Sequence, residues 1–180
     1  PEIKLSQGTI EHADEGAGPP VVFIHGFLVN GDLWRETALA LRDRARCIRP
    51  TLPLGAHRRA MGPSFDASPR GVARLILEFL DALELEDVTL VGNDTGGAIC
   101  QFVLDERPER IARVVLTNCD AFDRFPPAPF NALRVLPYIP GATFLTAQSG
   151  RIPLVRRVGF APLVKRRLTD EILADWYRPL

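Results

Sequence analysis

The stretch LVGNDTGGAICQ, residues 90–101, decides the fold of this chain. It reads as the end of an apolar strand, a tight turn rich in glycine, and the start of a helix with small side chains. Asp94 stands at the apex of the turn, with Gly92 before it and Gly96 and Gly97 after it. A strand–turn–helix of this kind lifts one side chain above the sheet, and its flanking residues must be small because strand and helix approach closely. The helix N-terminus adds positive potential that stabilises an anion there. The pattern predicts that Asp94 is presented as a nucleophile.

Asp94 alone leaves an alternative open, because Asp is also a favoured helix N-cap and turn residue. A second motif favours the functional interpretation. The segment FIHGF, residues 23–27, ends an earlier apolar run and can present the backbone N–H of Phe27 toward the turn. Together with the N–H of Thr95, it would form an oxyanion hole. The residues expected to support this loop and the turn are His25, Gly26, Gly92 and Gly96.

Strand and helix signals alternate along residues 1–120, which predicts an α/β fold with a mostly parallel sheet flanked by helices. The predicted strands are a hairpin of two edge strands within residues 3–16, a run buried on both faces at 21–24, and strands at 45–50, 88–93 and 111–119. The predicted helices are 32–43 with Asp32 as N-cap, a helix from Pro69 with Ser68 as N-cap, and 96–106. Such uninterrupted apolar strands are typical of parallel sheets.

Residues 121–180 differ in character, because prolines interrupt any long element and arginines add a locally basic, solvated surface. We expect short helices that begin a helical cap, or lid, over a hydrolase-like core formed by residues 1–120. The chain starts without Met and stops after a helix-like run, so we expect a piece of a longer protein that lacks the last strands. The strand at 111–119 would then present an apolar edge, which another chain could pair with, as in a homodimer.

Composition excludes several classes of partner. Twenty-two basic residues balance 22 acidic ones, so charge gives no reason to expect nucleic acid or an anionic membrane. No apolar run reaches the roughly 20 residues that a membrane span needs. The three cysteines, Cys47, Cys100 and Cys119, lack metal-ligand spacing and read as reduced thiols of a cytoplasmic protein. No cofactor and no metal are implied.

The motifs VVFIHGF, LVGNDTGG and PERIARVVLTN resemble the α/β-hydrolase fold superfamily, specifically the branch with an aspartate nucleophile. That branch contains haloalkane dehalogenases and epoxide hydrolases, and the resemblance covers about residues 1–120. It implies that Asp94 attacks an alkyl halide or epoxide, so the expected substrate is a small apolar electrophile. A histidine-activated water would then hydrolyse the resulting ester, with the oxyanion hole stabilising the intermediate.

Several positions depart from the family pattern. Haloalkane dehalogenases usually carry Trp and Asn where this chain has Thr95 and Phe27, and Phe27 is closer to the epoxide-hydrolase pattern. Epoxide hydrolases use cap tyrosines to protonate the epoxide oxygen. Tyr138 and Tyr177 are weaker candidates for that role, the alternative being tyrosines that only pack within the cap.

The family's catalytic histidine follows the last strand, whereas this chain has only His12, His25 and His57. His57 is a weaker candidate for the base, the alternative being an exposed loop histidine. Asn118 stands where some members carry the triad acid, and Asp120 could replace it or be a simple turn residue. Two other functions remain open: an ester or lactone hydrolase of the same fold, and a non-catalytic protein that binds a ligand in the same pocket.

Overall fold

A computed structural model describes residues 1–119, 135–161, 164–165 and 168–178 of the chain. The chain divides into two compact units, Pro1–Ala121 and Phe122–Leu180. Asp120 lies outside the described residues.

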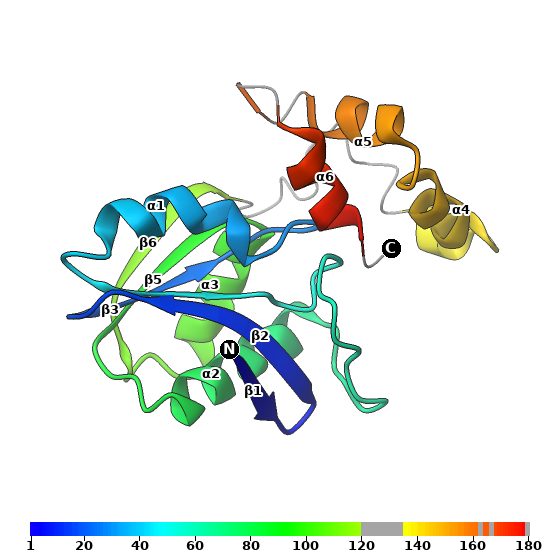
Figure 1. The fold of residues 1–180 in the computed structure, drawn as a ribbon. Helices are drawn as coiled ribbons and strands as arrows, with labels where there is room; N and C mark the ends of the chain where they lie inside the picture. Colours follow the sequence, from blue (N-terminus) through cyan, green and yellow to red (C-terminus); the bar gives the residue numbers. More distant parts are fainter. Residues whose placement is uncertain (120–134, 162–163, 166–167, 179–180) are drawn as a thin grey trace. The chain divides into compact units, whose positions relative to one another are not determined.

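The first unit is built on a six-stranded sheet in the order β1-β2-β4-β3-β5-β6 (Figure 1). The strands are β1 (Glu2–Leu5), β2 (Gly8–Glu15), β3 (Pro20–Ile24), β4 (Arg46–Pro50), β5 (Val88–Asp94) and β6 (Ile111–Cys119). β1 and β2 pair antiparallel, as do β2 and β4, whereas the β4-β3-β5-β6 part is parallel. The predicted α/β-hydrolase type of sheet, mixed and mostly parallel, is confirmed.

Helices cover both faces of this sheet (Figure 1). α1 (Arg35–Leu41) lies on one face, and α2 (Pro69–Ala82) and α3 (Thr95–Glu106) lie on the other. α2 begins as the sequence predicts: Ser68 Oγ accepts the N–H of Gly71 at 3.1 Å, and Pro69 occupies the first turn, where its missing N–H costs nothing.

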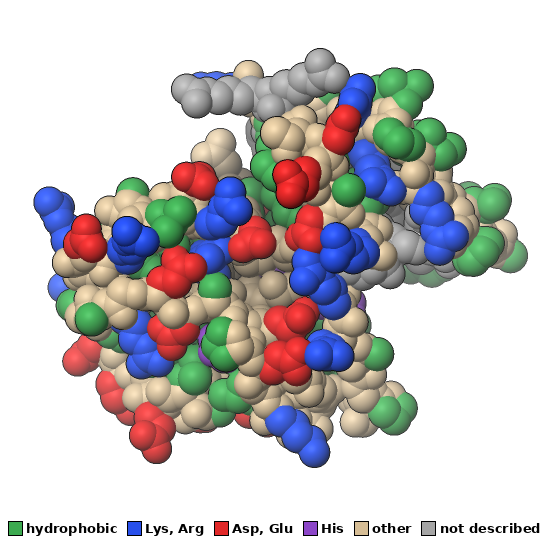
Figure 2. Space-filling model, in the orientation of Figure 1, with side chains coloured by type: hydrophobic (Ala, Val, Ile, Leu, Met, Phe, Trp, Pro, Cys, Tyr) green, Lys and Arg blue, Asp and Glu red, His purple; other side chains and the backbone are tan. Residues whose placement is uncertain are grey.

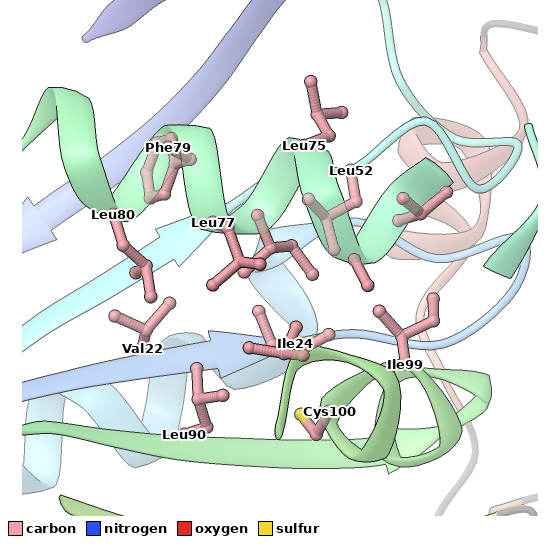
Figure 3. Packing of buried hydrophobic residues seen from close by; sticks show 14 of the residues in the cluster. Val22, Ile24, Leu52, Leu75, Leu77, Phe79, Leu80, Leu90, Ile99 and Cys100 are labelled. Carbon is pink, nitrogen blue, oxygen red and sulfur yellow. The ribbon is translucent and has the colours of Figure 1, made fainter. Parts of the chain in front are cut away.

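The main core lies between the sheet and the α2–α3 layer (Figure 3). Leu80 of α2 points toward Val22 of β3. Leu90 of β5 and Cys100 of α3 belong to the same cluster. All four side chains are fully buried. A smaller cluster on the α1 face has Phe23 against Trp34, with ring centroids 5.3 Å apart. Because β3 contributes to both clusters, it must be apolar on both faces, which explains its uninterrupted run.

Two local expectations are wrong. The helix after β3 starts with a 3-10 turn, η1 (Gly31–Trp34), and its N-cap is Asn30, whose Oδ1 accepts the N–H of Asp32 at 3.0 Å. Asp32 instead forms an ion pair with Arg49 of β4 at 2.7 Å, so its carboxylate is used between elements rather than for capping. β2 is also not an edge strand, because it pairs with β4 as well as with β1.

β6 is the last strand of the sheet among the described residues. Val115 and Leu116 are each 45% exposed there, although both are large apolar side chains. An apolar strand at an edge is suited to pairing with further chain. Elsewhere on the first unit, Figure 2 shows Lys and Arg interspersed with Asp and Glu over the visible surface.

The second unit contains η3 (Leu136–Tyr138), α4 (Ala142–Ser149), α5 (Pro153–Phe160) and α6 (Asp170–Tyr177). α5 and α6 pack through Phe160, whose ring centroid lies 5.3 Å from that of Trp176. Thr169 caps α6 by accepting the N–H of Ile172 at 3.3 Å. Over the parts of the chain that the structure describes, no helix combines the length and the apolar character needed to cross a membrane.

Candidate active site

Asp94 occupies the sharp turn between β5 and α3 with φ 54° and ψ −134°. A positive φ is unusual for a residue with a Cβ, and such strain is found mainly where function requires it. The same conformation defines the nucleophile turn of hydrolases, in which the strained residue projects above the sheet. The backbone therefore supports the predicted role of Asp94.

The glycines around Asp94 are required by close backbone approaches. A Cβ built on Gly92 would lie 2.7 Å from Cα of Gly97, and one on Gly96 would lie 2.5 Å from the carbonyl oxygen of His25. A Cβ on Gly97 would lie 2.2 Å from Cβ of Cys119. Contacts below 3.0 Å essentially do not occur for real Cβ atoms. The sequence correctly predicted small residues here, because any larger one would push α3 away from the sheet.

The carboxylate of Asp94 does not cap α3, although Asp94 stands at the N-cap position. Its Oδ2 instead accepts a hydrogen bond of 3.0 Å from the backbone N–H of Phe27. Gly26 lies against the same oxygen, since a Cβ there would be 2.2 Å from Oδ2. The structure thus joins the two motifs that the sequence singled out. Thr95, the other predicted donor, is the first residue of α3 and directly follows Asp94.

His25 directly follows β3, two residues before Phe27, and its side chain is fully buried. Its Nδ1 lies 2.8 Å from the carbonyl oxygen of Gly26, and its Nε2 accepts the backbone N–H of Leu52 at 2.8 Å. Burial lowers the pKa of His25 to about 4, so the ring is neutral at neutral pH. The bond from Leu52 joins the segment that follows β3 to the segment that follows β4. A second hydrogen bond joins the same two segments, because the N–H of Leu28 donates to the carbonyl oxygen of Leu54 at 2.9 Å.

His57, the weaker candidate for the base, belongs to the loop that begins after β4. It is half-buried rather than exposed, and burial lowers its pKa. Its Nδ1 is buried and has no hydrogen-bond partner among the described residues. Its charged form would lower the pKa of His25, so the two rings lie within electrostatic reach of each other. A neutral imidazole with a free nitrogen is compatible with a base, and its role stays a prediction.

The remaining candidates lie farther along the chain. Asn118 is exposed near the end of β6 and has a φ of 41°. Tyr138 is 85% exposed in the second unit. Tyr177 packs edge-on against Phe160 at 5.9 Å between ring centroids and lies beneath the guanidinium of Arg156, and burial raises its pKa. Tyr177 therefore has a packing role within its own unit.

Sequence reasoning missed the side chains that lock β5 to β6 behind the turn. Nδ2 of Asn93 donates to the carbonyl oxygen of Thr117 at 2.8 Å, and the hydroxyl of Thr117 donates to the carbonyl oxygen of Gly92 at 3.1 Å. No spacing in the sequence reveals these contacts, since the partners lie on different strands. The tie from Leu52 to His25 was missed for the same reason.

The described residues contain no group of three or more His, Cys, Asp or Glu side chains able to hold a metal ion. Cys47, Cys100 and Cys119 are all free thiols, and burial raises the pKa of Cys100 to about 12.

Comparison with known proteins places this geometry in a family. Residues 19–170 match the model of the alpha/beta hydrolase fold family. Over 114 residues the chain is 40% identical to "Haloalkane dehalogenase 2" of Mycobacterium tuberculosis, an alignment covering 63% of this chain and 39% of that protein. It is 32% identical over 115 residues to "Cis-3-alkyl-4-alkyloxetan-2-one decarboxylase" of Shewanella oneidensis, covering 63% of this chain and 36% of that protein. The matched region thus spans less than two fifths of these relatives.

Among solved structures, the epoxide hydrolase CorEH superimposes with a TM-score of 0.79 over 98% of this chain and 66% of that one, at 19% identity. This likeness shows the fold. The resemblance to the hydrolase fold and to haloalkane dehalogenases that the motifs indicated is confirmed, as is the hydrolase type of sheet. The match of the family model over most of the sequence shows that the chain belongs to the alpha/beta hydrolase fold family.

Proposed function

We propose that Asp94 is the nucleophile of a hydrolase that opens a small apolar electrophile, such as an alkyl halide or an epoxide, through an ester intermediate. One observation carries the proposal: the carboxylate at the strained turn is hydrogen-bonded to the backbone N–H of Phe27 rather than to its own helix. A carboxylate is the appropriate nucleophile for displacement at saturated carbon. The 40% identity to a protein named as a haloalkane dehalogenase supports the same chemistry.

In this proposal the two carboxylate oxygens of Asp94 have separate roles. Because Oδ2 is engaged by Phe27, Oδ1 is the oxygen that attacks the electrophilic carbon. The bond from that carbon to the leaving group breaks, and its electron pair leaves with the halide or with the epoxide oxygen, which then takes up a proton. Oδ2 becomes the carbonyl oxygen of the ester and still faces the Phe27 N–H.

Hydrolysis completes the cycle. Water attacks Cγ of Asp94 while a histidine takes its proton, and the negative charge develops on Oδ2. The Phe27 N–H, with that of Thr95 as the second predicted donor, stabilises this charge. His57 is the candidate for this base within the described residues. Collapse of the intermediate releases the alcohol and restores the carboxylate with one oxygen from water.

A lactone substrate is the second candidate. The Shewanella oneidensis relative is named for an oxetan-2-one, a strained cyclic ester. Such a ring also carries a saturated carbon bonded to a good leaving group, so attack by Oδ1 on that carbon would open it by the same step. A lactone-specific adduct would favour this candidate over the halide and the epoxide.

Intact-mass spectrometry tests the proposal directly. The chain is exposed in turn to small epoxides, alkyl halides and a β-lactone, and any adduct is mapped to a peptide. We expect an adduct on the peptide that contains Asp94, lost in Asp94→Asn and retained in Asp43→Asn, which changes an exposed carboxylate in a helix-to-strand loop. A sample that circular dichroism shows to be folded and that forms no adduct would contradict the proposal and favour a non-catalytic binding protein.

Solvent labelled with ¹⁸O tests the second step. If a base is available, a single turnover should place one labelled oxygen in Asp94 and none in the alcohol. Label in the alcohol instead would mean that water attacks the substrate directly and that no ester forms.

A further inference from the structure

One peptide group, between Gly26 and Phe27, is held from both sides. Its carbonyl oxygen lies 2.8 Å from Nδ1 of His25, and its N–H donates to Oδ2 of Asp94 at 3.0 Å. A carbonyl oxygen can only accept, so Nδ1 must carry the proton. The N–H of Leu52 can only donate, so Nε2 must accept. The ring of His25 is therefore neutral, with its proton on Nδ1.

We propose that His25 is a positioning residue for the oxyanion hole: its Nδ1–H fixes the plane of the Gly26–Phe27 peptide and so aims the Phe27 N–H at Oδ2 of Asp94. This inference rests on the proposed function. His25 acts through the peptide, so it would hold the donor in place before charge develops, which is the condition for efficient electrostatic stabilisation. Donation to the carbonyl also polarises the amide and strengthens its N–H as a donor.

The surroundings make this arrangement specific. Leu52 holds the far side of the ring, so His25 cannot turn without losing both bonds. Gly26 lets the peptide approach the carboxylate, because a Cβ at that position would collide with Oδ2. His25 is fully buried, which keeps water from replacing either partner, and its lowered pKa prevents a second N–H from facing Leu52 at neutral pH.

The tautomer can be measured without any turnover. A long-range ¹H–¹⁵N spectrum of the ¹⁵N-labelled chain at neutral pH should show His25 with a protonated Nδ1 and an unprotonated Nε2. Protonation at Nε2 would overturn the proposal, because the Gly26 carbonyl would then have no donor from the ring.

Two variants separate positioning from simple packing. The amide nitrogen of His25→Asn can reach the place of Nδ1 and keep the bond to Gly26, whereas the side-chain oxygen of His25→Gln can reach the place of Nε2 and keep only the bond to Leu52. We expect the backbone amide proton of Phe27 to keep its chemical shift in His25→Asn and to move in His25→Gln. We also expect hydrolysis of the Asp94 ester to be about tenfold or more slower in His25→Gln than in His25→Asn. Deleting an oxyanion-hole donor lowers the rate by about 10²–10³, and misaligning the donor should cause part of that loss.

The outcomes distinguish this inference from the proposed function. If the wild type forms no ester, the proposed chemistry fails, while the tautomer and the Phe27 amide shift still decide whether His25 orients the peptide. If both variants lose stability equally and neither moves the Phe27 amide shift, His25 has only a packing role and the inference is overturned.

Discussion

The backbone N–H of Phe27 donates a 3.0 Å hydrogen bond to Oδ2 of Asp94, although the two residues are 67 positions apart. The contact follows from the sheet. β3 and β5 are parallel neighbours with Ile24 opposite Gly92, so the segments that leave their carboxyl ends start side by side. Ligand sites of open α/β sheets lie outside these strand ends. Strand pairing thus brings a donor on one loop to a carboxylate on the next.

The strained backbone of Asp94 predicts a difference between two variants that both lack the carboxylate. Asp94→Gly should be more stable than Asp94→Ala by about 1–2 kcal/mol, because glycine adopts a φ of 54° without steric cost. Urea denaturation of both variants measures the difference. Equal free energies of unfolding would mean that the turn relaxes to an ordinary conformation once the carboxylate is removed.

The contact of Gly97 with Cys119 predicts that Gly97→Ala lowers the free energy of unfolding by about 1–3 kcal/mol through overpacking. This would occur although alanine is the better helix former. Adding Cys119→Gly, which removes the colliding Cβ, should recover part of the loss. The control is Gly159→Ala in α5, where the nearest atom would lie 3.8 Å from the new Cβ. A loss that is the same with and without Cys119→Gly would contradict the packing explanation.

Burial of His25 predicts that stability falls as the pH falls from about 6.5 to about 4. The folded pKa of about 4 lies below the unfolded value of 6.5, so the unfolded chain binds more protons in that window. At one pKa unit per 1.36 kcal/mol, the loss attributable to His25 is about 3 kcal/mol. Burial also lowers the pKa of His12 and His57, which adds a loss of the same sign.

Denaturant unfolding measured across this pH window, on the wild type and on His25→Gln, isolates the contribution of His25. The variant lacks the titrating group, so its stability should depend less steeply on pH. Parallel curves for the two proteins would show that His25 does not titrate with folding.

The burial of Arg49, compared with the exposure of Arg35, predicts unequal costs for two arginine substitutions. Arg49 is 4% exposed and pairs with Glu15 and Asp32, each at 2.7 Å, whereas these carboxylates are 32% and 58% exposed, so water can solvate them in Arg49→Met and the substitution should cost about 1–3 kcal/mol through the lost charged hydrogen bonds. Arg35 pairs with Glu36 at the surface, where the side chains are 60% and 82% exposed, and Arg35→Met should change stability by less than about 1 kcal/mol. Thermal denaturation of both variants checks the contrast, which similar losses would refute.

Signals that act over a few neighbouring residues were enough to predict most of the first unit. The buried runs of β3 and β5, the Ser68–Pro69 start of α2 and the glycines around Asp94 all carry their structural reason in adjacent residues. Local steric limits and hydrophobic periodicity act at that range, so these elements were predictable. The same glycine spacing indicated Asp94 as the candidate nucleophile.

Only the tertiary structure decided which polar groups meet. Asp32 could have capped its helix, but the packing of η1 against β4 brings Arg49 within its reach, and Asn30 takes the cap. Asp94 could have capped α3, but the neighbouring strand supplies the Phe27 N–H. Each residue had a local and a distant partner of similar chemistry, and the choice between them depends on strand order and register. The sequence by itself thus determined the elements and the turn, whereas long-range strand pairing determined the hydrogen bonds of the site.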